Sequence, residues 1–301
     1  MSTSNTLITA PDLDAQAIGA WAMRALAAVG KICTARDASE CLAHFFDATH
    51  TMGFTAGLYA VLIPEAGGEV SSITLFACDP AFAQGFDPGA DLMHPWLRYA
   101  RRHTTAIQGE DLFRREPDDT GAFAFAQQHG FGQCLLVPIA AGAELGRTEL
   151  LCLGVDEGAT SHLNETRPLK ALAHALAGEL HAWFTTKLQA SLLEDARLRP
   201  QDIQVLACEW QGLSSKEIAQ RTGMSVAAVD SRFQRLNLRL RCDNRRAAAR
   251  RAAEYGLLQS ASPCTAPVLP AGLMTGDAVA RALPLGPESP PLRRSAAQPW
   301  R

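Results

Sequence analysis

The clearest pattern of apolar positions lies between residues 198 and 258, where it predicts four helices joined by short turns. The first helix, over about residues 200–211, begins at Pro200, because a proline costs little at the first helical position. Its apolar residues recur at helical spacing and predict one buried face, made of Ile203, Leu206, Ala207 and Trp210. Gly212 follows at the place where a helix commonly ends in a left-handed residue.

The next two helices have sequence signals at both ends. Ser214 and Glu217 form an S-x-x-E capping box that opens the second helix, and Gly223 ends it. Ser225 caps a third helix over residues 226–240. The expected buried face of that helix is Val229, Phe233, Leu236 and Leu240. A short helix, a glycine-containing turn and a longer helix predict a helix-turn-helix, whose second helix enters the major groove of DNA.

Charge supports this interpretation. Asn244 caps a fourth helix that ends at Tyr255-Gly256, and the segment 198–258 holds eleven basic and six acidic side chains. Its net charge is +5 in a chain whose total is −3, and residues 1–197 carry −10. Such asymmetry is expected when one domain binds phosphates and the other does not. The alternative is an ordinary amphipathic bundle with a solvated basic face. The capping box and the turn favour DNA binding over this alternative.

The same segment resembles the DNA-binding domain of LuxR-type transcriptional regulators, in which the third helix reads bases and the fourth helps to dimerise. The matching residues are Leu198-Arg199-Pro200, Val205-Leu206, Gly212-Leu213-Ser214, Lys216-Glu217-Ile218-Ala219, Val229 and Asn244-Arg245. Two positions depart from the family pattern: Asp202 stands where Glu is usual, and Asp230 replaces a basic or neutral polar residue. A carboxylate at that second position can accept a hydrogen bond from a cytosine amino group.

From the resemblance and the basic charge we expect two kinds of DNA contact. Phosphate contacts are predicted for Lys216, Arg232, Arg235 and Arg245. Base reading is predicted for the exposed face of the third helix, made of Val226, Ala227, Asp230, Ser231 and Gln234. A glutamine such as Gln234 can pair bidentately with adenine.

Residues 13–190 alternate between helical and strand-like patterns. Helices over 13–48 are expected to bury Ile18, Trp21, Ala22 and Leu26. Strand-like runs follow at 53–64, 70–77, 134–140 and 148–156, with helical runs near 92–103, 122–129 and 167–188. Helix layers on an antiparallel sheet predict an α+β fold, an α/β/α sandwich with room for an apolar ligand between its layers. The predicted organisation is a sensor or dimerisation domain at 13–190, an all-α helix-turn-helix domain at 197–258 and a disordered tail at 259–301, which is rich in Pro, Ala, Ser and Gly.

The front domain resembles the autoinducer-binding domain of quorum-sensing LuxR regulators, which binds acyl-homoserine lactones. The resemblance rests on HGFGQCLLVPI at 129–139 and HPWLRYARRHTTAIQGEDL at 94–112. It implies ligand contacts at Phe82, Phe86, His94, Gln108 and Cys134, all of which differ from the family pattern. His94 stands for an Asp that accepts the ligand amide, and Gln108 for a Trp that donates to the lactone carbonyl. A neutral histidine brings no charge and a different shape, so we expect standard lactones to bind weakly or not at all. The alternative is that these five residues only pack or cap helices.

Several function classes lack their motifs. No run of about 18 apolar residues predicts a membrane span, and the N-terminal pattern leads us to expect no export signal. The eight cysteines show no C-x-x-C pair or adjacent His ligand, so we expect reduced thiols and no metal site. The G-x-S-x-G, H-E-x-x-H, P-loop and G-x-G-x-x-G motifs of enzymes are missing, so neither catalysis nor a cofactor is predicted.

These patterns together predict a cytoplasmic, homodimeric transcription regulator of LuxR type, a solo receptor with an altered signal pocket. Its signal is expected to be an acyl-homoserine lactone or an unrelated apolar ligand. Its expected partners are double-stranded DNA, a second copy of itself, other LuxR-type regulators and RNA polymerase. One alternative is an interaction protein that heterodimerises with another LuxR-type regulator and titrates it. Another is a GAF- or PAS-type sensor domain on the same DNA-binding unit.

Overall fold

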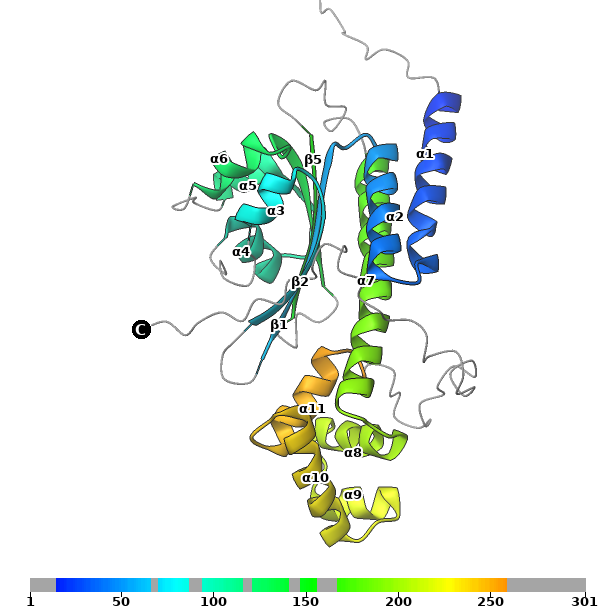
Figure 1. Cartoon of the computed structure of the whole chain (residues 1–301), viewed down its shortest axis with the longest axis vertical. Coiled ribbons are helices and arrows are strands. Elements are labelled where there is room, and N and C mark those ends of the chain that lie inside the picture. The colour runs from blue at the N-terminus through cyan, green and yellow to red at the C-terminus, as the bar shows by residue number, and fades with distance from the viewer. Residues whose placement is uncertain are drawn as a thin grey trace, which may run out of the picture.

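The computed structural model describes residues 15–65, 70–86, 94–115, 121–140, 147–155 and 167–258. A sheet covered by helices on both faces forms the front part of the chain, and a helical bundle forms the C-terminal part (Figure 1). The predicted α+β sandwich followed by an all-α helix-turn-helix domain is thus confirmed. The predicted disordered tail, from residue 259, lies outside the described residues.

The described strands form one antiparallel sheet in the order β2-β1-β5-β4-β3. The strands are β1 (Ala56–Pro64), β2 (Val70–Ala77), β3 (Ile107–Gln108), β4 (Gln133–Ile139) and β5 (Thr148–Val155). The central strands β1 and β5 are buried along almost their whole length. Their sequences therefore read as continuous apolar runs, because both faces of the sheet are covered by helices.

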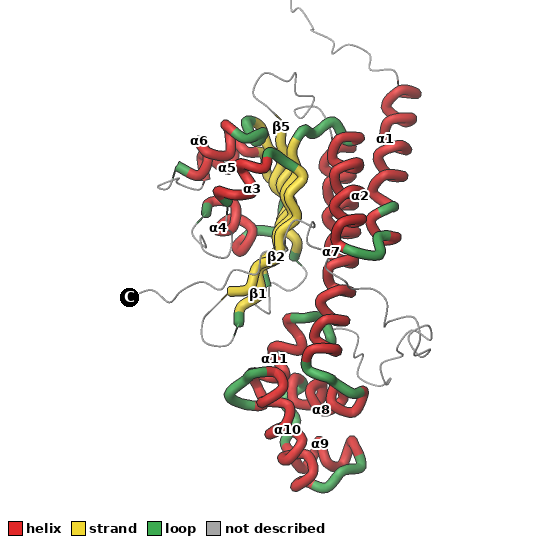
Figure 2. Tube along the Cα trace, in the orientation of Figure 1, coloured by secondary structure: helices red, strands yellow, loops and turns green. Residues whose placement is uncertain are grey.

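Two helical layers enclose this sheet (Figure 2). One face packs against α1 (Ala15–Gly30), the 3-10 turn η1 (Ile32–Thr34), α2 (Ala38–Thr51) and α7 (Arg167–Asp195). The other face packs against α3 (Pro80–Gly85), α4 (Pro95–Arg102), α5 (Gly109–Arg115) and α6 (Ala122–Gln128). The sheet thus separates two apolar cores.

One expectation for the front domain is wrong. Leu26 is 46% exposed, whereas Ala25 and Val29 are buried. The buried arc of α1 passes through Ala25, Ala28 and Val29, whose small side chains let the helix approach α2 and α7 closely. The helix α7 also runs to Asp195, beyond the predicted end at residue 188.

The C-terminal part contains α8 (Pro200–Trp210), α9 (Ser215–Thr222), α10 (Val226–Leu240) and α11 (Arg245–Glu254). The predicted caps are confirmed by hydrogen bonds from Glu217 N to Ser214 Oγ (3.4 Å), from Ala228 N to Ser225 Oγ (3.2 Å) and from Ala247 N to Asn244 Oδ1 (2.9 Å). Gly212, Gly223 and Gly256 all have positive φ angles, as their places at helix ends require.

Trp210 departs from its predicted place in the core. It is 47% exposed, while Val205 and Cys208 are buried instead. The face of α8 that packs against α9, α10 and α11 is therefore rotated relative to the predicted one. Among the described residues, no helix combines the length and the apolar character that a bilayer span needs.

Candidate nucleic-acid interface and ligand site

The outward face of α10 carries the five residues predicted to read bases. Val226, Ala227, Asp230 and Gln234 are exposed, and Ser231 is half-buried. The opposite face of α10 is buried in the helical core of the C-terminal domain. A helix with one buried and one exposed face has the form that a recognition helix needs to enter the major groove.

Arg232, one of the predicted phosphate contacts, is tied to the start of the domain. Its Nη1 lies 2.7 Å from Asp202 Oδ1, and Arg239 Nη2 lies 3.0 Å from Asp202 Oδ2. Asp202 is only 3% exposed and also accepts a hydrogen bond from Arg199 N at 3.0 Å. Burial alone would raise the pKa of Asp202. The amide of Arg199 and the two guanidinium groups outweigh burial and hold the pKa below its ordinary value. This carboxylate joins α8 to α10, a role that the sequence did not indicate.

A second chain of polar contacts joins α8, α9, α10 and α11. Arg245 Nη1 donates to Ser215 Oγ at 2.9 Å, and Ser215 Oγ donates to Asp230 Oδ1 at 2.9 Å. Arg245 Nε also lies 3.1 Å from Glu209 Oε2, and its guanidinium lies over the ring of Phe233. The exposed carboxylate of Asp230 is therefore tied to α9 through Ser215. Sequence reasoning missed Ser215, which is recognisable only once α9 and α10 are placed side by side.

Lys216 and Arg235 are the exposed members of the predicted phosphate set. Arg235 Nη1 donates to Ser231 Oγ, one turn earlier on α10, at 2.8 Å. Arg246 on α11 is exposed too, although no sequence signal singled it out. Cations thus border the exposed face of α10 and continue onto α11, as a duplex with two charged strands would require.

The predicted ligand residue Phe82 lies on α3 and Phe86 directly follows this helix, with their rings stacked at 5.3 Å. Phe82 also contacts Phe131 at 4.7 Å and Phe125 at 5.6 Å between ring centroids. We define the aromatic cluster as Phe76, Phe82, Phe86, His94, Trp96, Phe125, His129 and Phe131. This cluster lies between the sheet and the helices α3 to α6, in the layer where the fold class predicts an apolar ligand.

The other three predicted ligand residues occupy different positions around this core. His94 is buried, its ring lies edge-on to Phe86 at 4.9 Å, and its Nδ1 accepts from Trp96 N at 3.3 Å. Cys134 is buried in the same core beside Cys152, whose pKa is raised by burial and further by Cys134. Gln108 lies on the edge strand β3, opposite Leu135 of β4, and is half-buried. The structure thus brings Phe82, Phe86 and His94 together and places Cys134 in the same apolar core. Gln108 lies at the edge of the sheet, opposite Leu135, which packs into the core on the other face.

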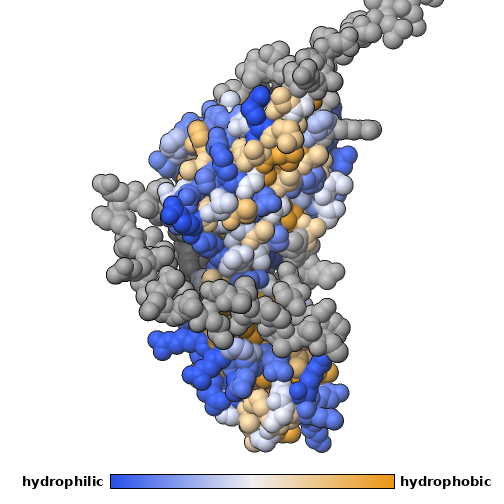
Figure 3. Space-filling model, turned by 90° about the vertical axis from the view of Figure 1, so that its right-hand side faces the viewer, coloured by the Kyte–Doolittle hydropathy of each residue, from blue (hydrophilic) through white to orange (hydrophobic). Residues whose placement is uncertain are grey.

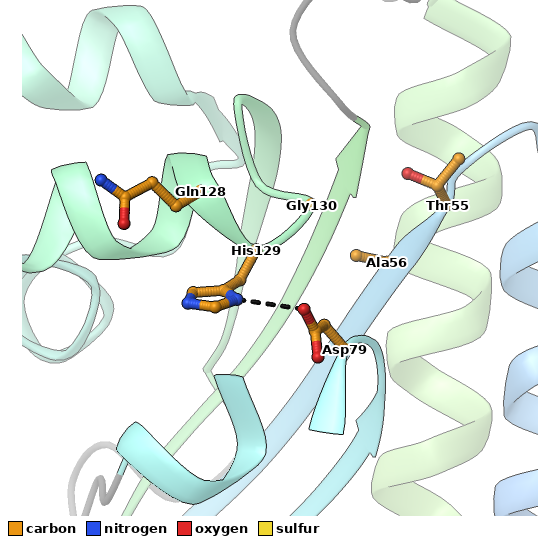
Figure 4. A pocket seen from close by; sticks show the side chains of 6 residues that line it. All are labelled: Thr55, Ala56, Asp79, Gln128, His129 and Gly130. Atoms are coloured by element: carbon orange, nitrogen blue, oxygen red, sulfur yellow. Dashed lines mark hydrogen bonds and ion pairs between the residues drawn. The ribbon is translucent and has the colours of Figure 1, made fainter. Parts of the chain in front are cut away.

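A pocket of about 250 Å³ opens beside the aromatic cluster (Figure 4). It is lined by Thr55, Ala56, Asp79, Gln128, His129 and Gly130. His129 Nδ1 lies 3.1 Å from Asp79 Oδ2, and Asp79 Oδ1 caps α3 by accepting from Ala81 N at 2.8 Å. The amide of Ala81 and the imidazole of His129 hold the pKa of Asp79 below its ordinary value. The pair joins the start of α3 to the end of α6, two short helices that carry rings of the cluster. In the described parts of the chain, no group of three His, Cys, Asp or Glu side chains is arranged to hold a metal ion.

Large apolar side chains are exposed on the outer helices of the front domain. Met23 and Leu26 on α1 and Phe46 on α2 are 67%, 46% and 50% exposed. Figure 3, which views this side of the molecule, shows apolar surface in its upper part and mostly polar surface over the C-terminal domain below. Exposed apolar patches of this kind mark protein–protein contact sites in many soluble proteins.

Comparison with known proteins agrees with both halves of this architecture. The family described as "Sigma-70, region 4" matches residues 199–236, which span α8, α9 and most of α10. No curated protein matches the sequence. The crystal structure of Escherichia coli SdiA is 14% identical, with a TM-score of 0.59, and the match covers 80% of this chain and 99% of SdiA. SdiA in complex with octanoyl-rac-glycerol is 14% identical, with a TM-score of 0.60 and coverage of 80% and 96%.

A third solved structure is CepR2 from Burkholderia cenocepacia, described as an N-acylhomoserine lactone dependent LuxR family transcription factor. It is 16% identical, with a TM-score of 0.47, and the match covers 56% of this chain and 98% of CepR2. From the two SdiA comparisons, the chain has the fold of SdiA over nearly the whole length of that protein, and its helix-turn-helix is similar to region 4 of sigma-70.

Proposed function

We propose that this chain is a cytoplasmic, DNA-binding transcriptional regulator of LuxR type that acts as a homodimer and has no catalytic activity. The observation that carries the proposal is the α9–Gly223–α10 unit, a capped helix-turn-helix whose second helix exposes a polar face bordered by cations. The match of residues 199–236 to a helix-turn-helix family and the fold shared with SdiA support it.

Phosphate contacts in this proposal come from Lys216, Arg232, Arg235 and Arg245. Lys216 and Arg235 are exposed, and the other two are held by ion pairs within the domain. A guanidinium group has several N–H donors, so one ion pair leaves further donors for a phosphate. Base reading comes from Val226, Ala227, Asp230, Ser231 and Gln234, with Asp230 positioned by Ser215.

The homodimer is proposed to form through the apolar surface of α1 and α2. Met23, Leu26 and Phe46 would bury apolar area against a second copy, which is the main favourable term in most protein association. A dimer places two recognition helices on two half-sites of a duplex.

The front domain is proposed to bind a small apolar signal in the aromatic cluster, as a solo receptor whose pocket differs from that of lactone receptors. The solved complex of SdiA with octanoyl-rac-glycerol supports an acyl ligand for this fold. His94 Nδ1 already accepts a hydrogen bond from Trp96 N, so it is not available to a ligand amide.

Salt dependence of DNA binding tests the core of the proposal. Full-length protein is used to select its site from a random DNA pool, and affinity for that site is measured by fluorescence anisotropy from low to high salt. Because each phosphate contact releases about 0.9 of a counterion, four contacts per protomer predict a steep negative log–log slope, about −3.6 per protomer. Lys216→Ala should weaken binding to all sequences and make the slope shallower by about one per protomer.

Lys31→Ala is the matched control, because it removes one cation from the front domain, where Lys31 pairs with Asp47. It should leave the slope unchanged. A slope near zero would contradict DNA binding through phosphates. If no DNA is selected and the protein instead forms a stable heterodimer with another LuxR-type regulator, the titration alternative replaces this proposal.

A further inference from the structure

Trp96, on α4, has a buried indole N–H without a hydrogen-bond partner in the described structure. The side chain is fully buried, and Nε1 is within reach of neither an acceptor nor solvent. The indole nitrogen is only a donor, so no alternative protonation satisfies it. Most buried polar groups in folded proteins are paired, and an exception often has a functional reason.

The surroundings of Trp96 are aromatic and uncharged. Its ring centroid lies 6.1 Å from that of Phe82, 5.9 Å from Phe86, 5.3 Å from Phe131 and 5.0 Å from His94. None of these three phenylalanine rings carries an acceptor for the indole. His94 has one acceptor nitrogen in its neutral form, and the structure uses Nδ1 to cap α4 through Trp96 N.

The matched indole on the other face of the sheet behaves differently. Trp183 on α7 donates from Nε1 to Ala35 O at 2.8 Å. The fold therefore satisfies one buried tryptophan and leaves the other open at the centre of the aromatic cluster.

We propose that the aromatic cluster binds a neutral, apolar ligand that carries a carbonyl oxygen, and that Trp96 Nε1 donates to this oxygen. The proposal rests on the proposed signal-binding function and names the ligand chemistry. An ester or ketone fits, because it offers an acceptor and requires no acceptor in return. A charged ligand does not fit, because the described rings around Trp96, those of Phe82, Phe86, His94 and Phe131, supply no permanent charge to offset its desolvation. A ligand that must donate an amide N–H lacks a partner, since Nδ1 of His94 is occupied.

Trp96 and the rings around it should report ligand binding spectroscopically. Rings in this cluster already pack against each other, and protein interiors are close to crystal density. A ligand must therefore move rings such as Phe82, on the six-residue helix α3, and Phe86, which directly follows that helix. Binding should change both the near-ultraviolet circular dichroism of the aromatic side chains and the resonance of the Trp96 indole.

The experiment uses two probes that differ in one oxygen. Octanoylglycerol has an ester carbonyl, and octyl glycerol ether has the same chain and head group without that carbonyl. Calorimetry on the full-length protein should give about threefold to tenfold tighter binding of the ester, the range expected for one net hydrogen bond. Trp96→Phe should bring the two affinities within about twofold of each other, because it keeps an aromatic ring and removes the donor. Trp183→Phe, the matched control on the other face, should leave the ester preference intact.

A nuclear magnetic resonance measurement on the wild type covers the case in which Trp96→Phe does not fold. The chain has five tryptophans, so the nitrogen-15 indole spectrum is simple. One buried indole N–H should move downfield on adding the ester, as a new hydrogen bond requires, and should not move downfield to that extent on adding the ether. An ester preference that survives in folded Trp96→Phe, or an indole that does not respond to the ester, would overturn the proposal.

The remaining outcomes separate this inference from the proposed DNA binding. If neither probe binds while the salt-dependent DNA affinity is intact, the cluster is core packing only, and DNA binding stands without this site. If the ester preference depends on Trp96 but no DNA is bound, the ligand chemistry stands and the proposed regulator function fails.

Discussion

Asp202→Asn offers a direct test of how the helix-turn-helix domain is held together. The substitution keeps the size of the side chain and one acceptor, and it removes the charge that pairs with Arg232 at 2.7 Å and Arg239 at 3.0 Å. Removing one partner of a fully buried ion pair costs about 3–5 kcal/mol. The two arginine side chains are 19% and 32% exposed and can recover some hydration. We therefore expect the free energy of unfolding of the domain to fall by a smaller amount, about 2 kcal/mol.

Hydrogen exchange in the full-length protein measures this effect locally. At about 1.4 kcal/mol per decade, the expected loss makes the amides of α8 and α10 exchange roughly 30-fold faster. The front-domain sheet should keep its protection. Asp47→Asn is the control, because its exposed pair with Lys31 should contribute little stability. Unchanged protection of α10 in Asp202→Asn would refute the reasoning that this carboxylate joins the two helices.

The same variant should change the acid sensitivity of the domain. The folded state lowers the pKa of Asp202, so its contribution to stability is complete above the unfolded pKa of about 3.9. That contribution is lost as the pH falls through the lower folded pKa. Asp202→Asn should therefore be less stable than the wild type at neutral pH. Below about pH 4, its free energy of unfolding should change less with pH than that of the wild type.

Two further substitutions test the sites. Asp230→Ala should cost about 1–3 kcal/mol of binding free energy at one base pair of the selected site and spare the others. Ser215→Ala leaves the carboxylate and removes its hydrogen-bond donor, so it should cost less at that base pair. A uniform gain in affinity across sequences would instead show that Asp230 only repels DNA. The wild type should bind acyl-homoserine lactones weakly, and His94→Asp should restore some of that affinity. The substitution should not uncap α4, because Asp is also a good N-cap. Nanomolar lactone binding by the wild type in calorimetry would contradict this.

Local signals predicted the caps of the C-terminal helices correctly. The interaction of Ser214, Ser225 or Asn244 with an amide three residues later is contained within one short segment, so the sequence is enough to define it. The start of α3 has such a signal too, because Asp79 is followed by Pro80. We did not predict this helix, since two turns give too short a period to distinguish from a loop.

Contacts between elements were harder to predict, and the errors have a common cause. Periodicity in α1 and α8 defines a broad apolar arc, and only the neighbouring helices decide which edge of that arc is covered. Leu26 and Trp210 stand at the uncovered edges and are exposed. A charge count has the same limit, because it registers Arg232 as a cation and cannot show that Asp202, thirty residues earlier, is its partner.

Contacts between the sheet domain and the C-terminal helices join segments that lie far apart in the sequence. They connect the two proposed sites, the aromatic cluster and the exposed face of α10. Arg251 of α11 lies 2.5 Å from Glu65 at the end of β1, and Gln189 of α7 donates to Gly256 O at 2.9 Å. Arg147, just before β5, donates to Glu254 O at 3.3 Å and forms a buried ion pair with Glu149. The strands β1 and β5 also carry core residues beneath the aromatic cluster on the opposite face. A ligand influences DNA binding only if it binds two arrangements of the protein with different affinity. The end of α11 contacts Glu65, which follows β1, and Arg147, which precedes β5. A shift of these strands on ligand binding would therefore act first on α11, the helix that follows the proposed recognition helix α10.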